Sequence, residues 1–159
     1  MGTTSNYISI MIDGLKKKIL ILNQILVYTN KEKELLQVEP FDTNAFDINM
    51  REKSEVVEQL KALDNGFTSV FNRVKIEIET YKSMYENQIN QMKILISRIT
   101  ELSVEIQSKE VRNKGLAQKQ FGNIKRELTT AKRSGQMASN YYKSMSMVDT
   151  EPQFLDKKK

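Results

Sequence analysis

Residues 8 to 29 read ISIMIDGLKKKILILNQILVYT and carry apolar side chains at alternating steps of four and three. That spacing places them on one face of a helix, and a seam of this kind faces other helices. Further apolar residues widen the face beyond the seam of a two-stranded zipper, which favours a bundle of three or four helices. The seam consists of Ile8, Ile12, Leu15, Ile19, Leu22, Leu26 and Thr29, widened by Met11, Ile25 and Tyr28.

A second helix is expected after a short break. Pro40 disfavours helical geometry at the residue before it and closes the first helix. Either Asp42 or Thr43 can cap the free backbone N–H groups of the next helix, and Phe46 leads its buried face. The second seam keeps the same alternation at Val57, Leu60, Phe67, Phe71, Val74, Ile78 and Tyr81.

The second seam keeps its phase through Asn65 and Gly66, although this dipeptide is a frequent turn signal. We therefore expect one continuous helix with a soft point at Gly66. Ser83 and Glu86 have the spacing of a capping box, which marks the start of a third helix. The apolar face of that helix runs through Tyr85, Ile89, Met92, Leu95, Ile96, Ile99, Leu102 and Ile106, and thins abruptly at Lys109 to Gly115.

The three expected helices have matching lengths. At about 1.5 Å per residue each is a rod of roughly 50 to 60 Å, and short connections let such rods lie antiparallel with their seams buried. The sequence thus predicts an all-α fold, an elongated antiparallel three-helix bundle with up-down-up topology and a C-terminal helical extension. We expect helices at about 5–38, 43–81 and 84–116 in a bundle of residues 1–116, a basic amphipathic segment at 117–148 and a flexible tail at 149–159.

The composition removes most catalytic chemistry. The chain has no Cys and no His, so it offers no disulfide, no thiolate or imidazole, and few of the usual zinc ligands. Glu101 and Glu105 lie one helical turn apart, but a di-iron site in a bundle also needs histidines, so surface ion pairing is their expected role. We expect no enzyme activity, no cofactor and no metal.

The densest apolar run, residues 19–28, spans about ten residues, whereas a membrane helix needs about 20. We interpret this run as a core segment. The N-terminal residues match neither a signal peptide nor a myristoylation pattern. We therefore expect a cytoplasmic protein without a membrane span.

The segment after Leu116 differs from the rest of the chain in charge. The last 43 residues hold 9 Lys/Arg against 4 Asp/Glu, which accounts for the whole net charge of +5. Because the three helices close a core without it, this segment has no obvious partner within the chain. Continued as a helix, it aligns a narrow apolar stripe, which we expect to bind a partner and to become fully helical on binding. The stripe consists of Phe121, Ile124, Leu128, Ala131, Gly135, Ala138, Tyr142 and Met145.

Other roles for this segment stay open. The helix can fold back on the bundle or pair with a second copy, as in a homodimer. Its basic residues admit nucleic acid or an anionic membrane, but no nucleic-acid-binding motif accompanies them and few bulky apolar residues oppose them. We expect a solvated helix face and no nucleic acid partner. The basic residues are Lys119, Lys125, Arg126, Lys132, Arg133 and Lys143.

Three parts of the chain resemble a known family. They are LDNGF at residues 63–67, TELSVEIQ at residues 100–107, and the ending with YYKSM at residues 141–145 and FLDKK at residues 154–158. Over nearly its whole length the chain resembles the FlgN-type flagellar export chaperones. The resemblance implies a small cytoplasmic helical protein that binds flagellar hook-filament junction proteins, prevents their premature assembly and delivers them to the flagellar type III export apparatus.

The resemblance also implies where partners bind. In the family the C-terminal helical region binds the cargo, and tyrosines near that end are implied to dock on the export gate or the export ATPase complex. The candidate partner-binding residues are therefore Phe121, Ile124, Leu128, Ala131, Ala138, Tyr141, Tyr142 and Met145. The alternative is a structural coiled coil or self-assembling helical protein, in which the same segment completes a homo-oligomeric bundle.

Overall fold

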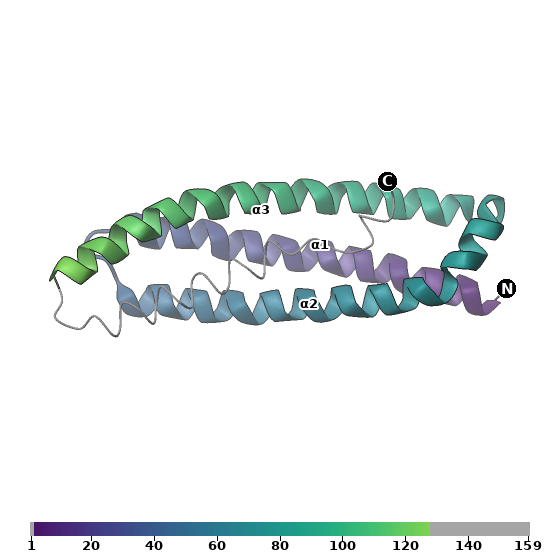
Figure 1. The fold of residues 1–159 in the computed structure, drawn as a ribbon, viewed down its shortest axis with the longest axis horizontal. Helices are drawn as coiled ribbons and strands as arrows, with labels where there is room; N and C mark the ends of the chain where they lie inside the picture. Colours follow the sequence, from purple (N-terminus) through teal and green to yellow (C-terminus); the bar gives the residue numbers. More distant parts are fainter. Residues whose placement is uncertain (1, 128–159) are drawn as a thin grey trace. The chain divides into compact units, whose positions relative to one another are not determined.

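All regular elements in the described part of the chain are helices. The computed structural model describes the backbone of residues 2–127 and the side chains of residues 2–122. The predicted all-α fold is confirmed. The elements are α1 (Gly2–Gln37), α2 (Thr43–Thr80), the short 3-10 helix η1 (Lys82–Tyr85) and α3 (Glu86–Glu127). Figure 1 labels the three long helices.

The described residues form two compact units, and each unit takes a part of all three long helices. Unit 1 contains residues 2–23 and 59–103, and unit 2 contains residues 24–58 and 104–127. The predicted tail at 149–159 and most of the predicted segment at 117–148 lie outside the described residues.

Side-chain pairs within unit 1 give the relative direction of α1 and α2. The hydroxyl of Thr4 donates to a carboxylate oxygen of Glu77. Further along α1, Lys18 pairs with Asp64, which lies earlier on α2. The residue number rises along α1 while it falls along α2, so these two helices run antiparallel.

Pairs within unit 2 give the direction of α3. Thr29 contacts Glu110, and the backbone carbonyl of Leu36 accepts from the side chain of Gln120. Here the residue number rises along both helices, so α1 and α3 run parallel. The predicted three-helix bundle with up-down-up topology is confirmed.

The start of α2 follows a local sequence signal, whereas the start of α3 does not. The carboxylate of Asp42 accepts from the backbone N–H of Ala45 at 3.0 Å, which confirms Asp42 as a cap of α2. Ser83 lies inside η1, and α3 begins at Glu86. The predicted capping box at Ser83 is therefore wrong, because the preceding 3-10 turn already leads into α3.

The buried face of α1 differs from the predicted seam at two positions. Ile19 and Leu26 are only partly buried, whereas their neighbours Lys18 and Ile25 are buried. Polar side chains occupy part of this face because they find partners on α2 and α3. The buried residues of α1 are Thr4, Ile8, Met11, Ile12, Leu15, Lys18, Ile21, Leu22, Ile25, Thr29, Glu32 and Leu36.

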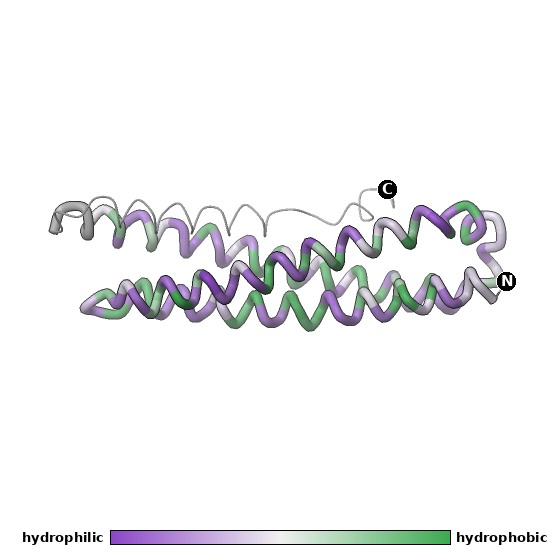
Figure 2. The backbone as a smooth tube through the Cα atoms, turned by 90° about the horizontal axis from the view of Figure 1, so that it is seen from below, coloured by the Kyte–Doolittle hydropathy of each residue, from purple (hydrophilic) through white to green (hydrophobic). Residues whose placement is uncertain are grey.

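The faces of α2 and α3 follow their predicted seams more closely. Hydrophobic residues recur along each helix in Figure 2, with hydrophilic ones between them. Tyr81 is 52% exposed, and Phe71, Ile89 and Leu95 are only partly buried. The buried residues at predicted positions are Val57, Leu60, Phe67, Val74 and Ile78 on α2, and Met92, Ile96, Ile99, Leu102 and Ile106 on α3, with Tyr85 in η1.

The helix α2 is continuous through Gly66, as predicted. A Cβ added at Gly66 meets nothing within 4 Å, and its φ is not positive. We expect Gly66→Ala to raise the free energy of unfolding by about 1 kcal/mol, because alanine loses less backbone entropy on entering a helix. Urea unfolding followed by circular dichroism measures this change. The reverse substitution at an exposed site of the same helix, Ala62→Gly, should lower stability by a similar amount, and a destabilised Gly66→Ala would show that α2 needs the glycine.

Candidate functional site

The predicted partner-binding residues differ in what the structure shows of them. Phe121 is buried in unit 2. Ile124 belongs to α3, although its side chain is not among those that the structure describes. The other predicted residues, namely Leu128, Ala131, Ala138, Tyr141, Tyr142 and Met145, lie outside the described residues.

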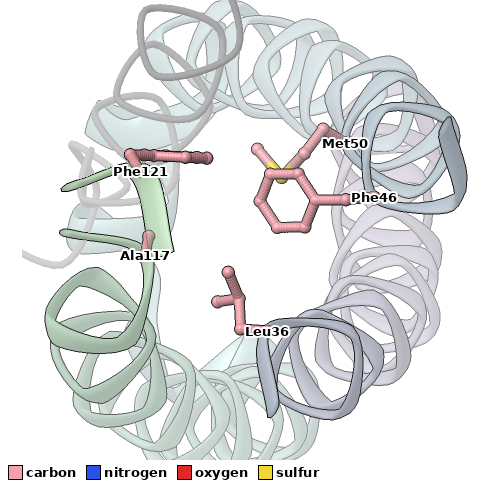
Figure 3. Packing of buried hydrophobic residues seen from close by; sticks show 5 residues of the cluster. All are labelled: Leu36, Phe46, Met50, Ala117 and Phe121. Carbon is pink, nitrogen blue, oxygen red and sulfur yellow. The ribbon is translucent and has the colours of Figure 1, made fainter. Parts of the chain in front are cut away.

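Phe121 belongs to an apolar cluster built from all three long helices of unit 2. Its ring meets that of Phe46 edge to face with the centroids 5.9 Å apart, and the ring of Phe46 lies 5.5 Å from that of Phe41. Such aromatic pairs add about 0.5 to 1.5 kcal/mol beyond the burial of their area. Figure 3 shows the cluster, whose members are Leu36, Phe46, Met50, Ala117 and Phe121.

The expectation that the chain from Ala117 onward has no partner within the protein is wrong for its first residues. Ala117, Gln120 and Phe121 are buried. The side-chain amide of Gln120 donates to the backbone carbonyl of Leu36 at 2.8 Å. The helix α3 also runs without a break past Leu116. This part of the predicted binding segment therefore belongs to the bundle core.

A pocket of about 320 Å³ lies at the C-terminal end of α1, next to α3. Leucine side chains line it together with amide and charged groups. The lining residues are Leu36, Gln37, Glu39, Leu116, Lys119 and Gln120.

Three charged side chains lie buried in unit 2, and we call Glu32, Lys53 and Glu110 the buried charged triad. Each comes from a different helix, and none is more than 2% exposed as a side chain. The ammonium nitrogen of Lys53 lies 2.7 Å from Oε1 of Glu32 and also donates a hydrogen bond to Oε1 of Glu110. One cation thus faces two carboxyl groups inside the helix interface.

Neutral polar side chains hold the triad in place. Asn113 Nδ2 donates to the backbone carbonyl of Thr29 at 2.8 Å and to Oε2 of Glu32 at 3.3 Å. The hydroxyl of Thr29 lies 3.1 Å from Oε1 of Glu110. Thr29 and Asn113 are themselves fully buried. The triad is therefore part of a larger polar layer that joins α1, α2 and α3 within unit 2.

The triad perturbs the acidity of Glu32. Burial raises the pKa of Glu32 from 4.5 to about 7, and repulsion from Glu110 adds to the rise, while attraction to Lys53 opposes it. A carboxyl group near its pKa at neutral pH can hold or release a proton with small changes of pH.

A second, partly buried ion pair lies in unit 1. Lys18 Nζ lies 2.6 Å from Oδ1 of Asp64. Burial lowers the pKa of Lys18 and raises the pKa of Asp64, and attraction within the pair opposes both shifts. In the seam of α2, Asp64 occupies the one position between Leu60 and Phe67 where the alternation calls for an apolar residue. The ion pair with Lys18 fills that position.

Sequence reasoning missed the buried charged triad. The apolar face of α3 thins between Lys109 and Gly115. Apolar spacing alone therefore gives no sign that positions in this stretch are buried. The four-three spacing continues through Ile106, Glu110, Asn113 and Ala117, all of which are buried. Following the spacing without regard to polarity could have found Glu110 and Asn113, because a heptad position stays buried whatever residue occupies it.

The described residues offer neither a cluster of metal ligands nor a helix suited to cross a membrane. Among residues 2–127 no group of three or more His, Cys, Asp or Glu could hold a metal ion. No helix in this part of the chain combines the length and the apolar character needed to cross a bilayer. Comparison with known proteins gives no match: no family model, no curated protein and no solved structure matches the chain.

Proposed function

We propose that this protein is a non-enzymatic cytoplasmic export chaperone that binds a flagellar hook-filament junction protein, prevents its premature assembly and delivers it to the flagellar type III export apparatus. The resemblance of the sequence to the FlgN-type chaperones supports the proposal, and an all-α bundle is compatible with it. The binding segment in this proposal begins after the bundle core.

One observation carries the proposal. Phe121 closes the apolar cluster of unit 2, whereas the apolar stripe of the sequence continues well past Glu127, the last residue described in α3. The stripe thus extends further than the cluster that the described residues build. The residues proposed to contact cargo are Ile124, Leu128, Ala131, Ala138, Tyr142 and Met145.

The proposed mechanism is the packing of two amphipathic helices. The stripe lies against an apolar helix face of the junction protein, which would otherwise take part in filament assembly. Burial of apolar side chains stabilises the complex, and the basic residues around the stripe speed the encounter with an acidic partner. Tyr141 and Tyr142 are proposed to contact the export gate or ATPase complex.

Truncation tests the proposal. We expect a chain of residues 1–127 to bind purified junction protein at least about tenfold more weakly than the full chain, a loss of about 1.4 kcal/mol or more. The cut follows Glu127 and not Leu116, because Ala117, Gln120 and Phe121 are part of the core. Isothermal titration calorimetry measures the affinity of each chain for the junction protein. Circular dichroism checks that the bundle is as helical in the truncated chain as in the full chain.

Two results would decide against the proposal. Equal binding by both chains would place the cargo site on the bundle itself. Dimers of the full chain in light scattering, lost in the 1–127 chain and formed without any cargo binding, would favour the alternative of a self-assembling helical protein.

A further inference from the structure

We infer that the buried charged triad is a proton-binding site, in which Glu32 holds a proton in the folded protein and releases it on unfolding. The inference does not depend on the proposed function. It starts from the count of charges, because two carboxyl groups face the single ammonium of Lys53. With both carboxyl groups ionised, the site would hold one uncompensated negative charge away from water, which costs several kcal/mol.

The hydrogen bonds point the same way. Glu110 Oε2 has no hydrogen-bond partner among the described residues. Glu32 Oε1 lies 2.7 Å from Lys53 Nζ, the same ammonium that donates to Glu110. One shared ammonium and one carboxyl oxygen without a donor stabilise two full negative charges poorly, whereas one proton removes the second charge.

Thr29 supplies a third geometric argument. Its hydroxyl oxygen lies 2.8 Å from the backbone carbonyl of Ile25 and 3.1 Å from Oε1 of Glu110. A hydroxyl has one hydrogen and can donate to only one of these acceptors at a time. Thr29 therefore cannot donate to Ile25 and to Glu110 at once, so it gives the Glu110 carboxyl group at most part of one hydrogen bond.

The surroundings contain no other charge that faces Glu32 in the described part of unit 2. Lys53 faces it from α2 and Glu110 faces it from α3. The guanidinium of Arg112 bonds to Oδ1 of Asn113, on the side of that amide away from Glu32. The charge balance of the site is therefore set by the triad.

The direction of the pH effect follows from the raised pKa of Glu32. The folded protein keeps the proton up to about pH 7, whereas the unfolded chain loses it near the ordinary value of 4.5. The stabilisation by this site is complete below about pH 4.5 and falls as the pH rises to about 7, above which it is lost. Within this window the unfolding equilibrium constant increases about tenfold per pH unit for one proton.

The variant Glu110→Gln tests the inference. Its amide keeps an oxygen for Lys53 and Thr29 and places the NH₂ group at the unpartnered position, so Glu32 and Lys53 form a balanced pair. Urea unfolding of the full chain at pH 5, 6, 7 and 8 measures the slope of the unfolding free energy against pH, which gives the number of protons released on unfolding. Between pH 5 and 7 we expect this number to be smaller by about one in the variant than in the wild type.

An exposed glutamate of the same unit provides the control. Glu58→Gln should keep the wild-type slope, because Glu58 is exposed on α2. Asp64 contributes equally in all three proteins, so the comparison isolates the triad. A Glu110→Gln slope equal to that of the wild type would overturn the inference.

A native-state measurement covers the case in which Glu110→Gln does not fold. Carbon-13 NMR of the side-chain carboxyl carbons follows each glutamate of the folded wild-type protein between pH 4 and 8. We expect one buried glutamate signal to titrate near pH 7. Titration of every glutamate below about pH 5.5 would overturn the inference as well.

Discussion

Replacement of Lys53 by methionine is expected to lower the free energy of unfolding by about 3 to 5 kcal/mol at pH 8, the cost of removing one partner from a buried ion pair. Lys53 is the one cation of the buried charged triad and is fully buried. Without it, Glu32 and Glu110 face each other with no compensating charge. The loss should be smaller at pH 5, where protonation of Glu32 removes one of the two buried negative charges.

Two further variants separate this effect from a general sensitivity of α2. Lys61→Met removes an exposed lysine of the same helix and should change stability by less than about 0.5 kcal/mol. The triple change Glu32→Leu, Lys53→Met and Glu110→Leu should recover most of the loss, because an apolar layer needs no compensating charge. A Lys53→Met protein as stable as the wild type at pH 8 would show that the triad is exposed to water in solution.

The second large effect is expected for Phe46→Ala, which should cost about 3 to 5 kcal/mol. Phe46 is 0% exposed and is the member of the apolar cluster that contacts the rings of both Phe41 and Phe121. Its removal leaves a cavity that the rigid ends of three helices cannot fill. Thermal and urea unfolding followed by circular dichroism measure the loss.

A double-mutant cycle gives the sharper result. The combined Phe46→Ala and Phe121→Ala protein should be more stable than the sum of the single losses predicts, by about 0.5 to 1.5 kcal/mol for the ring pair. Tyr81→Ala is a suitable control, because Tyr81 is mostly exposed and belongs to unit 1. Additive losses would mean that α3 does not pack Phe121 against Phe46.

Much of the fold was predictable because apolar spacing and turn chemistry agree. The break before α2 was predicted from Pro40 and Asp42, and the structure confirms the cap by Asp42. The unbroken phase around Gly66 outweighed the local turn signal, since a turn would have shifted the buried positions that follow it. Helix continuity is therefore better predicted from the long-range register than from a dipeptide.

The polar parts of the interface were not predictable from apolar spacing alone. Lys18 and Glu32 are not part of the predicted apolar seam of α1, and both are buried. A buried charge is stable only with a partner, and the partners Asp64 and Lys53 lie on another helix. How far apart two such partners lie in the sequence depends on how the helices align. The spacing of residues within one helix carries no information about that alignment.

The candidate binding site was predictable only in part for a related reason. The charge imbalance distinguishes the C-terminal segment from the rest of the chain, but it does not locate the last residue of the bundle core. The sequence pattern makes Phe121 the first residue of the apolar stripe. In the structure Phe121 is buried in one cluster with Leu36 of α1 and Phe46 of α2, which lie far from it in the sequence. The stripe proposed to bind cargo therefore begins later than the sequence suggested.

Hydrogen–deuterium exchange of the full chain, with and without purified hook-filament junction protein, tests the central claim most directly. The account predicts that cargo slows exchange within residues 124–145 and leaves the helices of residues 2–121 unchanged. Slower exchange confined to residues 2–121, with none in residues 124–145, would contradict it.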